Sequence, residues 1–576
     1  MITKVRDYFS FKLNQDKRSD AVMNWLKHYI VTNIVYSKSH WRSIFKLPFS
    51  GVFWLINIFH PNRLKHRTAR REYESALCEI TLQDAAYVGE KVLIDATWDN
   101  PNYWFRSVVL IKALGIKKRN LVGIIGKNRR SDQRNTLKAL GVNQIFDLLL
   151  MQESASKVKR QVDSLCSEIN SSADILSCKL QYSVPGKLLY DYLLKRQKRS
   201  RVDIHHADFR KDLFTYLLNI ENAISIVEKT KPGLAVLSHG KSETGPLMWV
   251  SLKNNVKVIV SKSDYGCLRY WRLDGCDDIW HQQDCLSQQE LDSLSQERRE
   301  QFATVGDKAV KKRLTGRDDS LAAQFAYKTP GTVVDKSAIC DELNWDSKKK
   351  IVAVYASTWF DWPHTYGMKN FLDFEDWITS VYGVAKRCER FNWLIKAHVS
   401  DSWYGGVSIN DLVDFDESDH IKLASRKWNG ASMLASMDAF VTVHGTVGLE
   451  ATAIGKPVLV SDVGWYDDHG FVRKPNDRDE FLDLLSTDWW SGMDFAANSQ
   501  KAKTFAGSYW GRPCWQEDFF LQDDSKQWNL YDSLQRLPVV HKKVITKESE
   551  LIRSWYASGH PHYHTYKMLL AEKIQI

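Results

Sequence analysis

The stretch 441–450, VTVHGTVGLE, combines residue types and spacing that could bind a phosphate. An apolar run leads into an expected helix start, where two glycines allow tight turning and close approach of the backbone. The first N–H groups of a helix, together with the positive end of its dipole, bind anions. Glu450 follows Thr446 by four residues and therefore lies about one turn, ~6 Å, further along the same face. The spacing predicts that the helix start binds a nucleotide phosphate while Glu450 accepts hydrogen bonds from a sugar hydroxyl.

Two other apolar runs end in polar side chains that could bind a nucleotide. One run ends in Ser357 and Thr358, whose hydroxyl groups suit a phosphate or a ribose. Lys396 and His398 stand two residues apart at the end of WLIKAHVSD, so a strand there would point both to one face. Lysine neutralises a phosphate, and a protonated histidine would support a departing nucleotide. The residues predicted to contact the nucleotide are Ser357, Thr358, Lys396, His398, His444, Gly445, Thr446, Val447 and Glu450.

The elements that must position these residues form two series of short apolar runs, each run followed by a helical pattern. Runs without strict alternation suit strands that are buried on both faces of a parallel sheet. Strands that alternate with helices predict two doubly wound α/β domains, whose ligands bind beyond the carboxyl ends of the strands. The runs are 91–96, 120–126, 143–149, 233–240 and 256–264 in the first half, and 349–357, 391–398, 421–425, 439–445 and 456–462 in the second.

These patterns divide the chain into five parts. A polar segment at 287–348 separates the two series of runs. The first series contains a charged, amphipathic stretch at 151–215, which is typical of a helical insertion. The expected parts are a basic and apolar segment at 1–75, a first α/β domain at 76–286 with its insertion at 151–215, a linker at 287–348, a second α/β domain at 349–514 and C-terminal helices at 515–576.

Composition limits the classes of partner. The 576 residues include 80 Lys and Arg against 69 Asp and Glu, a formal net charge of +11, which favours an anionic partner such as a nucleotide, an acidic polymer or a membrane surface. No zinc-finger, RNP or helix-turn-helix spacing is present, so we do not expect nucleic acid to be the partner. Nine cysteines without a CxxC pair fit a reducing cytoplasm.

The apolar stretch 44–59 and the basic run that follows it allow two interpretations. The stretch is shorter than the ~18 apolar residues of a spanning helix, and the first thirty residues show no secretory signal. It either packs on its own domain or lies in a membrane interface beside anionic lipid.

Residues 349–475 resemble the nucleotide-binding half of GT-B glycosyltransferases. The order VYAST, LIKAHVS, HGTVGLEATAIGKPVL and SDVGWYDDHGF is most similar to bacterial capsule and lipopolysaccharide enzymes that use CMP-activated ulosonic acids such as Kdo. In that group a Lys-x-His-Pro strand end and a Gly/Ser-Thr-x-Gly-x-Glu helix start hold the nucleotide. This sequence departs from the pattern at Val399, where proline is usual, and at His444, where serine or glycine is common.

The resemblance implies a GT-B fold, in which two Rossmann-like domains face a cleft and C-terminal helices cross back to the first domain. It implies that Lys396, His398, Gly445, Thr446 and Glu450 contact the donor and that 465–470 shape its pocket. UDP-sugar 2-epimerases and polyol-phosphate transferases have similar helix starts, so the resemblance leaves them open.

The catalytic group would then come from the first domain, where the acceptor binds. A carboxylate serves either as nucleophile or as the base that deprotonates the acceptor hydroxyl. Glu243 and Asp264 are the first candidates because SHGKSETG and VSKSDYG end predicted strands, and His239 and Asp99 hold similar positions.

We therefore expect a metal-independent glycosyltransferase without a further cofactor, which transfers a sugar, Kdo or another ulosonic acid, to a bacterial surface polysaccharide. A CMP-linked donor is favoured, and the expected location is the cytoplasm, including the inner face of the inner membrane. The alternatives are a nucleotide-sugar epimerase and a non-catalytic glycan-binding or scaffold subunit. His560, His562 and His564 lack a complete metal-ligand set, so we expect a tail that faces solvent or contacts the acceptor.

Overall fold

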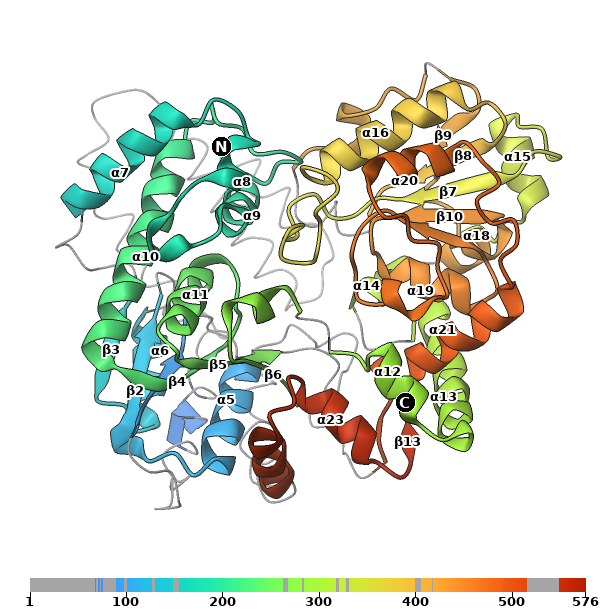
Figure 1. Cartoon of the computed structure of the whole chain (residues 1–576). Coiled ribbons are helices and arrows are strands. Elements are labelled where there is room, and N and C mark those ends of the chain that lie inside the picture. Colours follow the sequence, from blue (N-terminus) through green and yellow to red (C-terminus); the bar gives the residue numbers. More distant parts are fainter. Residues whose placement is uncertain are drawn as a thin grey trace, which may run out of the picture. The chain divides into compact units, whose positions relative to one another are not determined.

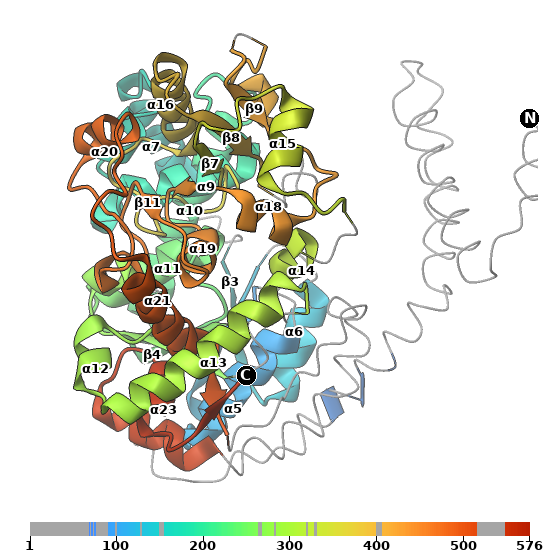
Figure 2. The same cartoon turned by 90° about the vertical axis from the view of Figure 1, so that its right-hand side faces the viewer.

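The structure is a computed structural model of the chain (Figures 1 and 2). Asp99, Asp264 and the stretch 44–59 lie outside the residues that it describes, as does nearly all of the segment 1–75. It describes residues 90–97, 101–126, 130–148, 155–262, 268–281, 284–317, 321–327, 331–398, 406–416, 418–514 and 548–576, with a few positions between 68 and 75.

The first domain is built on a six-stranded sheet with the order β3-β2-β1-β4-β5-β6. Its first five strands pair in parallel and coincide with the five apolar runs predicted in the first half. The sixth strand, which the sequence patterns did not indicate, pairs antiparallel with β5 at the edge of the sheet. The strands are β1 (Lys91–Asp95), β2 (Leu121–Ile125), β3 (Gln144–Asp147), β4 (Pro232–Leu237), β5 (Lys257–Lys262) and β6 (Arg269–Leu273).

The second domain is built on a five-stranded, entirely parallel sheet with the order β11-β10-β7-β8-β9. All five strands coincide with predicted runs. They are β7 (Ile351–Tyr355), β8 (Asn392–Lys396), β9 (Ile421–Leu423), β10 (Ala439–Thr442) and β11 (Val458–Val460). Two doubly wound α/β sheets in one chain confirm the predicted fold class.

Helices cover both faces of the second sheet, because alternate strand residues point to opposite sides. Val352 and Val354 belong to a core with α16 (Phe374–Arg387) and α20 (Arg478–Leu485). Ile351 and Ala353 belong to a separate core with α18 (Gly430–Ser436), α19 (Thr446–Ala453) and α21 (Phe495–Trp510). Figure 1 shows α16 on one side of β7 and α19 on the other. Burial on both faces explains why these strands read as continuous apolar runs.

The first domain has the same layering, with a long helical crossover between β3 and β4. Helices α5 (Pro101–Ala113) and α6 (Arg130–Ala139) follow β1 and β2, and α11 (Gly245–Lys253) follows β4. The crossover contains α7 (Ala155–Glu168), α8 (Asp174–Ser177), α9 (Gly186–Gln197) and α10 (Phe209–Thr230). Their apolar faces share a core with β2, β4 and β5. The crossover therefore braces the sheet and extends beyond the expected insertion at 151–215.

Residues 287–348, for which the polar sequence indicated a linker, contain packed helices. Figure 2 shows the longest of them, α13, running beside α21. The two helices approach closely because a glycine of each, Gly306 and Gly507, leaves room for a backbone carbonyl of the other. The helices of this segment are α12 (Gln288–Ser293), α13 (Gln296–Leu314), α14 (Leu321–Tyr327) and α15 (Lys336–Leu343).

The C-terminal residues cross back to the first domain, as the predicted fold requires. The Arg272 backbone N–H in β6 donates to the Pro561 carbonyl, and the Arg553 side chain donates to the Ala113 carbonyl at the end of α5. The described C-terminal elements are a helix at 548–558, α23 (Tyr563–Leu570) and β13 (Ile574–Gln575), which pairs with β12 (Arg512–Pro513). Among the residues that the structure describes, no helix is both long and apolar enough to cross a bilayer.

Candidate functional site

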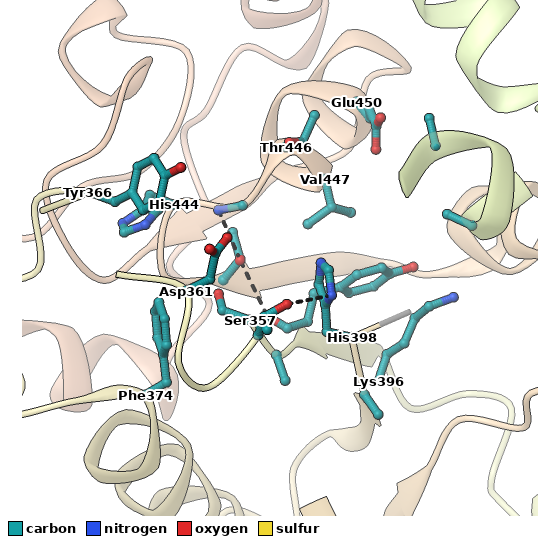
Figure 3. A pocket seen from close by; sticks show the side chains of 18 of the residues that line it. Ser357, Asp361, Tyr366, Phe374, Lys396, His398, His444, Thr446, Val447 and Glu450 are labelled. Atoms are coloured by element: carbon teal, nitrogen blue, oxygen red, sulfur yellow. Dashed lines mark hydrogen bonds between the residues drawn. The ribbon is translucent and has the colours of Figure 1, made fainter. Parts of the chain in front are cut away.

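A cavity of about 330 Å³ lies at the carboxyl ends of β7, β8 and β10, where an open α/β sheet is expected to bind its ligand (Figure 3). Residues from three strand ends and from the first turn of α19 line it. All nine residues predicted to contact a nucleotide are among them: Ser357, Thr358, Lys396, His398, His444, Gly445, Thr446, Val447 and Glu450. The structure therefore gathers residues that are up to 93 positions apart around one cavity.

The start of α19 is shaped by a contact that only glycine permits. Gly445 is the N-cap residue, and its carbonyl accepts a 2.6 Å hydrogen bond from the Tyr466 hydroxyl. A Cβ atom at Gly448 would overlap that hydroxyl. Gly445 has no side chain with which to cap the helix, so the first N–H groups of α19 receive no capping oxygen from the N-cap residue, and the helix start lines the cavity. This is the geometry of an anion site.

Burial sets the protonation of the two polar residues at the end of β8. The Thr358 hydroxyl lies 2.9 Å from Nδ1 of His398, and burial lowers the pKa of His398 below its ordinary value. His398 is consequently neutral at pH 7, so it does not meet the condition under which a histidine would support a departing nucleotide by its charge. Burial also lowers the pKa of Lys396 to about 8, with the charge of Glu450 opposing the shift. Lys396 therefore carries its charge at pH 7 but loses it at mildly alkaline pH.

Glu450 is held by two residues of the segment that was expected to be a linker. Its Oε1 accepts a 2.8 Å hydrogen bond from Nε of Arg313 in α13, and its Oε2 accepts one of 2.5 Å from the hydroxyl of Tyr327 in α14. All three side chains are buried, and all three line the cavity. A carboxylate has about four acceptor positions, so Glu450 retains capacity for a ligand hydroxyl. No pattern in the sequence indicated Arg313 or Tyr327 as site residues.

The loop between β7 and α16, residues 356–373, adds further side chains to the cavity. Asp361 is an exposed carboxylate, and Tyr366 is half-buried. The rings of Tyr366 and Phe374 lie 6.5 and 6.3 Å from the ring of His444, whose pKa burial lowers to about 4. His444 is thus a neutral part of the wall. Ser357 and Thr358 could be predicted as site residues because they follow the end of a predicted strand, but nothing in the sequence distinguished Asp361.

A second cavity of about 320 Å³ lies between the two domains. The first domain contributes the carboxyl ends of β4 and β5 and the start of β6, and the second contributes Thr365, Tyr366 and Tyr509. Tyr366 and Tyr509 also line the first cavity. The two cavities therefore share a wall.

The structure describes two of the four catalytic candidates, His239 and Glu243, and places them differently. His239 lines the second cavity, where burial lowers its pKa to about 3, helped by the charge of Lys241. Glu243 lines neither cavity in the part of the chain that the structure describes; its charge acts instead on Tyr192 and Arg196 of α9. Asp99 and Asp264 remain predictions outside the described residues.

Two of the three histidines near the C-terminus are packed inside the molecule and the third, His560, is half-buried, which corrects the expectation of a solvent-facing tail; contact of the tail with the acceptor stays a prediction. His562 and His564 are buried, and the Thr565 hydroxyl donates a 2.9 Å hydrogen bond to Asp284. The Trp271 and His562 rings stack at 6.3 Å. Across the described ranges, no cluster of three His, Cys, Asp or Glu side chains is arranged to hold a metal ion.

Two Rossmann-like domains, the second with a cavity at its strand ends, define a fold of the GT-B type. No protein-family model matches the sequence, and no curated protein matches it. Among solved structures, the chain is similar to KpsC of Thermosulfurimonas dismutans, a beta Kdo 2,4 transferase, at 12% identity and a TM-score of 0.29 over 48% of this chain and 79% of that one.

Two other solved structures cover more of the chain. One is UDP-GlcNAc 2-epimerase from Neisseria meningitidis bound to UDP-GlcNAc, at 12% identity and a TM-score of 0.22 over 73% of this chain and 97% of that one. The other is the wall teichoic acid polymerase TagF, at 10% identity and a TM-score of 0.22 over 86% and 99% of the two chains. Because these TM-scores are below 0.5, the fold assignment rests on the strand orders described above.

Proposed function

We propose that the chain is a glycosyltransferase that binds a nucleotide-activated sugar in the first cavity. The observation that supports this proposal is the convergence of a helix start, Lys396 and a tethered Glu450 on one cavity at the strand ends. The helix start and Lys396 bind the phosphates. Glu450, which Arg313 and Tyr327 orient, accepts hydrogen bonds from sugar hydroxyls of the nucleotide.

The acceptor then occupies the second cavity, on the other side of Tyr366. In the transfer, an acceptor hydroxyl oxygen forms a bond to the anomeric carbon of the donor sugar while the bond from that carbon to the phosphate oxygen breaks. The acceptor proton requires a base. Glu450 and Asp284 are buried in ion pairs with Arg313 and Arg269, whereas Asp361 is exposed in the loop that lies along both cavities. We therefore propose Asp361 as the base, in place of Glu243.

The finer assignments are proposals that rest on the sequence resemblance. A CMP-linked ulosonic acid is the favoured donor, and a surface polysaccharide at the inner face of the inner membrane is the favoured acceptor. Lys396 and the helix start supply positive charge at the phosphates, so we propose that no metal ion is needed. Turnover that persists in excess chelator would support this, and turnover that only Mg²⁺ or Mn²⁺ restores would contradict it.

The test of the donor site is thermal unfolding of the full chain with CMP, CDP, UDP, GDP and ADP. A ligand at 100 times its dissociation constant stabilises the folded state by about 2.7 kcal/mol. We expect one nucleotide to raise the midpoint and Lys396→Met to reduce the increase. Lys348→Met, which changes an exposed lysine just before β7, should retain it. If none of the five nucleotides raises the midpoint, the proposed function is wrong.

A transferase and an epimerase differ in their need for an acceptor. An epimerase converts its nucleotide sugar without a second substrate, whereas a transferase releases the nucleotide as it glycosylates an acceptor. Following the nucleotide sugar by NMR with and without acceptor oligosaccharides distinguishes them. If a ring carbon of the intact nucleotide sugar is inverted without acceptor, the proposed activity is that of an epimerase and not of a transferase.

A further inference from the structure

We propose that the second cavity binds an acidic sugar, one that carries a carboxylate or a phosphate, and that this sugar is the acceptor. The inference rests on the proposed function, because it names the substrate class of the acceptor half of the same site. It is carried by the side chains that line the cavity.

Three cationic side chains from three neighbouring elements reach this cavity. Lys241 follows β4, Lys262 ends β5 and Arg269 begins β6. Lys241 is 7% exposed and Arg269 is 2% exposed, so both charges lie in a setting where an anion is attracted far more strongly than in water. Asp284 is the carboxylate among the described lining residues, and it lies 3.3 Å from the Arg269 guanidinium. Cations thus outnumber carboxylates three to one in this lining.

A buried hydroxyl provides an independent observation. Ser261, within β5, is fully buried and lines the cavity, and its Oγ has no hydrogen-bond partner among the residues that the structure describes. Buried polar atoms are nearly always hydrogen-bonded, and leaving one without a partner costs about 1–3 kcal/mol. The Ser261 hydroxyl can donate a hydrogen bond to an anionic oxygen next to the lysine that follows it in the chain.

The remaining lining matches the body of a sugar. Tyr103, Trp271, Tyr366 and Tyr509 contribute aromatic side chains, which suit the C–H faces of sugar rings. Nζ of Lys241 lies 3.5 Å from the centre of the Tyr366 ring, so one cation stands directly against the wall shared with the first cavity. An acidic group bound there would hold the acceptor beside the donor.

The alternative source of an acidic group is the donor sugar itself. A donor reaching across Tyr366 would place its own carboxylate against Lys241. The two sources differ in what they require, because an acceptor binds without the nucleotide portion and without Lys396, whereas a donor group is brought to the cavity by its nucleotide.

The experiment is calorimetric titration of the full chain with glucuronate, glucose 6-phosphate and glucose, with the first cavity saturated by whichever nucleotide raised the midpoint. We expect at least one acidic sugar to bind at least tenfold more tightly than glucose. Lys262→Met should weaken that binding at least tenfold, and Ser261→Ala, which removes only an oxygen atom, should weaken it measurably. Lys348→Met should leave it unchanged.

Three outcomes would overturn the inference: equal affinity for the acidic sugars and glucose, no effect of either substitution in the second cavity, or loss of acidic-sugar binding in Lys396→Met but not in Lys262→Met. The last outcome would place the acidic group in the first cavity. The midpoint shift measures nucleotide binding independently of the sugar titration. A second sugar titration, without nucleotide, measures the binding of the sugar alone. Failure of the proposed function and failure of this inference are therefore distinguishable.

Discussion

The carboxylate of Asp191, in helix α9 of the first domain, lies 2.8 Å from Nδ1 of His364 in the β7–α16 loop of the second. The same carboxylate accepts hydrogen bonds from the backbone N–H groups of His364 and Thr365 and from the Thr365 hydroxyl. All three side chains are buried. The crossover helices of the first domain therefore fix the loop that carries Asp361 and Tyr366.

Neighbouring contacts reinforce this attachment. The Tyr190 hydroxyl donates a 2.6 Å hydrogen bond to Asp373, and Arg201 donates two more, of 3.0 and 3.2 Å. Asp373 also caps α16 by accepting from the Asp376 N–H at 2.8 Å. The side chain that begins α16 is thus oriented by the first domain, which couples the placement of the loop to the contact between the domains.

We expect Asp191→Asn to lower both stability and nucleotide affinity. An amide cannot accept from four donors, so at least one buried donor loses its partner, at a cost of about 1–3 kcal/mol. The loop should then hold Tyr366 less firmly against the first cavity. The measurements are urea unfolding and nucleotide titration. The matched control is Asp212→Asn, which removes a buried carboxylate that Arg196 binds within the first domain. Equal losses of affinity in the two variants would contradict a role for Asp191 in positioning the loop.

The pKa of Lys396 predicts how nucleotide binding depends on pH. Its ammonium group is charged below about pH 8 and neutral above it, so an anionic ligand should bind more weakly as the pH rises. With that pKa, the affinity should fall about tenfold between pH 7 and pH 9. The measurement is the dissociation constant of the nucleotide across this range. Lys396→Met should bind weakly with no such slope, and Lys348→Met should retain it. A flat profile in the unmodified chain would show that Lys396 does not contact the phosphates.

Arg313 should contribute to the free energy of unfolding because it neutralises the buried carboxylate of Glu450. Arg313→Met leaves Glu450 buried without its cation, and breaking a buried pair in this way costs about 3–5 kcal/mol. Arg313→Met combined with Glu450→Gln should recover part of that loss, which a double-mutant cycle of unfolding free energies measures. Arg390→Met, at a half-exposed pair with Asp488, should cost less than about 1 kcal/mol. Strictly additive effects of the two buried substitutions would disprove the coupling.

Gly306→Ala should destabilise the contact between α13 and α21. Its Cβ atom would overlap the Lys503 carbonyl, a backbone atom that cannot move independently of α21. Overpacking of this kind costs about 1–3 kcal/mol. Gly383→Ala is the matched control, because a Cβ there meets only the tip of Arg387 and alanine favours the helix by about 0.5–1 kcal/mol. Thermal unfolding should separate the two, and equal midpoints would contradict the close approach of the helices.

The ten parallel strands and the lining of the first cavity could be predicted because both depend on local patterns. Strands buried on both faces are continuous apolar runs, and the residues at their carboxyl ends converge wherever the sheet is parallel. β6 was missed because RYWRL has cations at its first and fourth positions, and Arg269 is buried through contacts with Asp284 and the Tyr509 carbonyl, which both lie outside the strand.

Other residues were missed because their positions depend on tertiary contacts. Helix α13 is polar on average, which made it resemble a linker. Its buried residues nevertheless recur at helical spacing, at Phe302, Gly306, Ala309 and Arg313, and this period could have been detected in the sequence. Asp361 and Asp191 had no such signal. Their placement depends on the contact between two domains that are far apart in the sequence.

Asp361→Asn should abolish transfer without abolishing nucleotide binding. An amide cannot take the acceptor proton, and general base catalysis contributes about 10²–10⁴-fold to a rate. We expect kcat to fall by at least 100-fold while the midpoint shift with nucleotide is retained. Glu243→Gln, which changes a carboxylate beside α9, should leave kcat within about twofold. The measurement is nucleotide release in the presence of acceptor, with stability checked in each variant. If Glu243→Gln loses activity and Asp361→Asn retains it, the base belongs to the first domain, as the sequence first indicated.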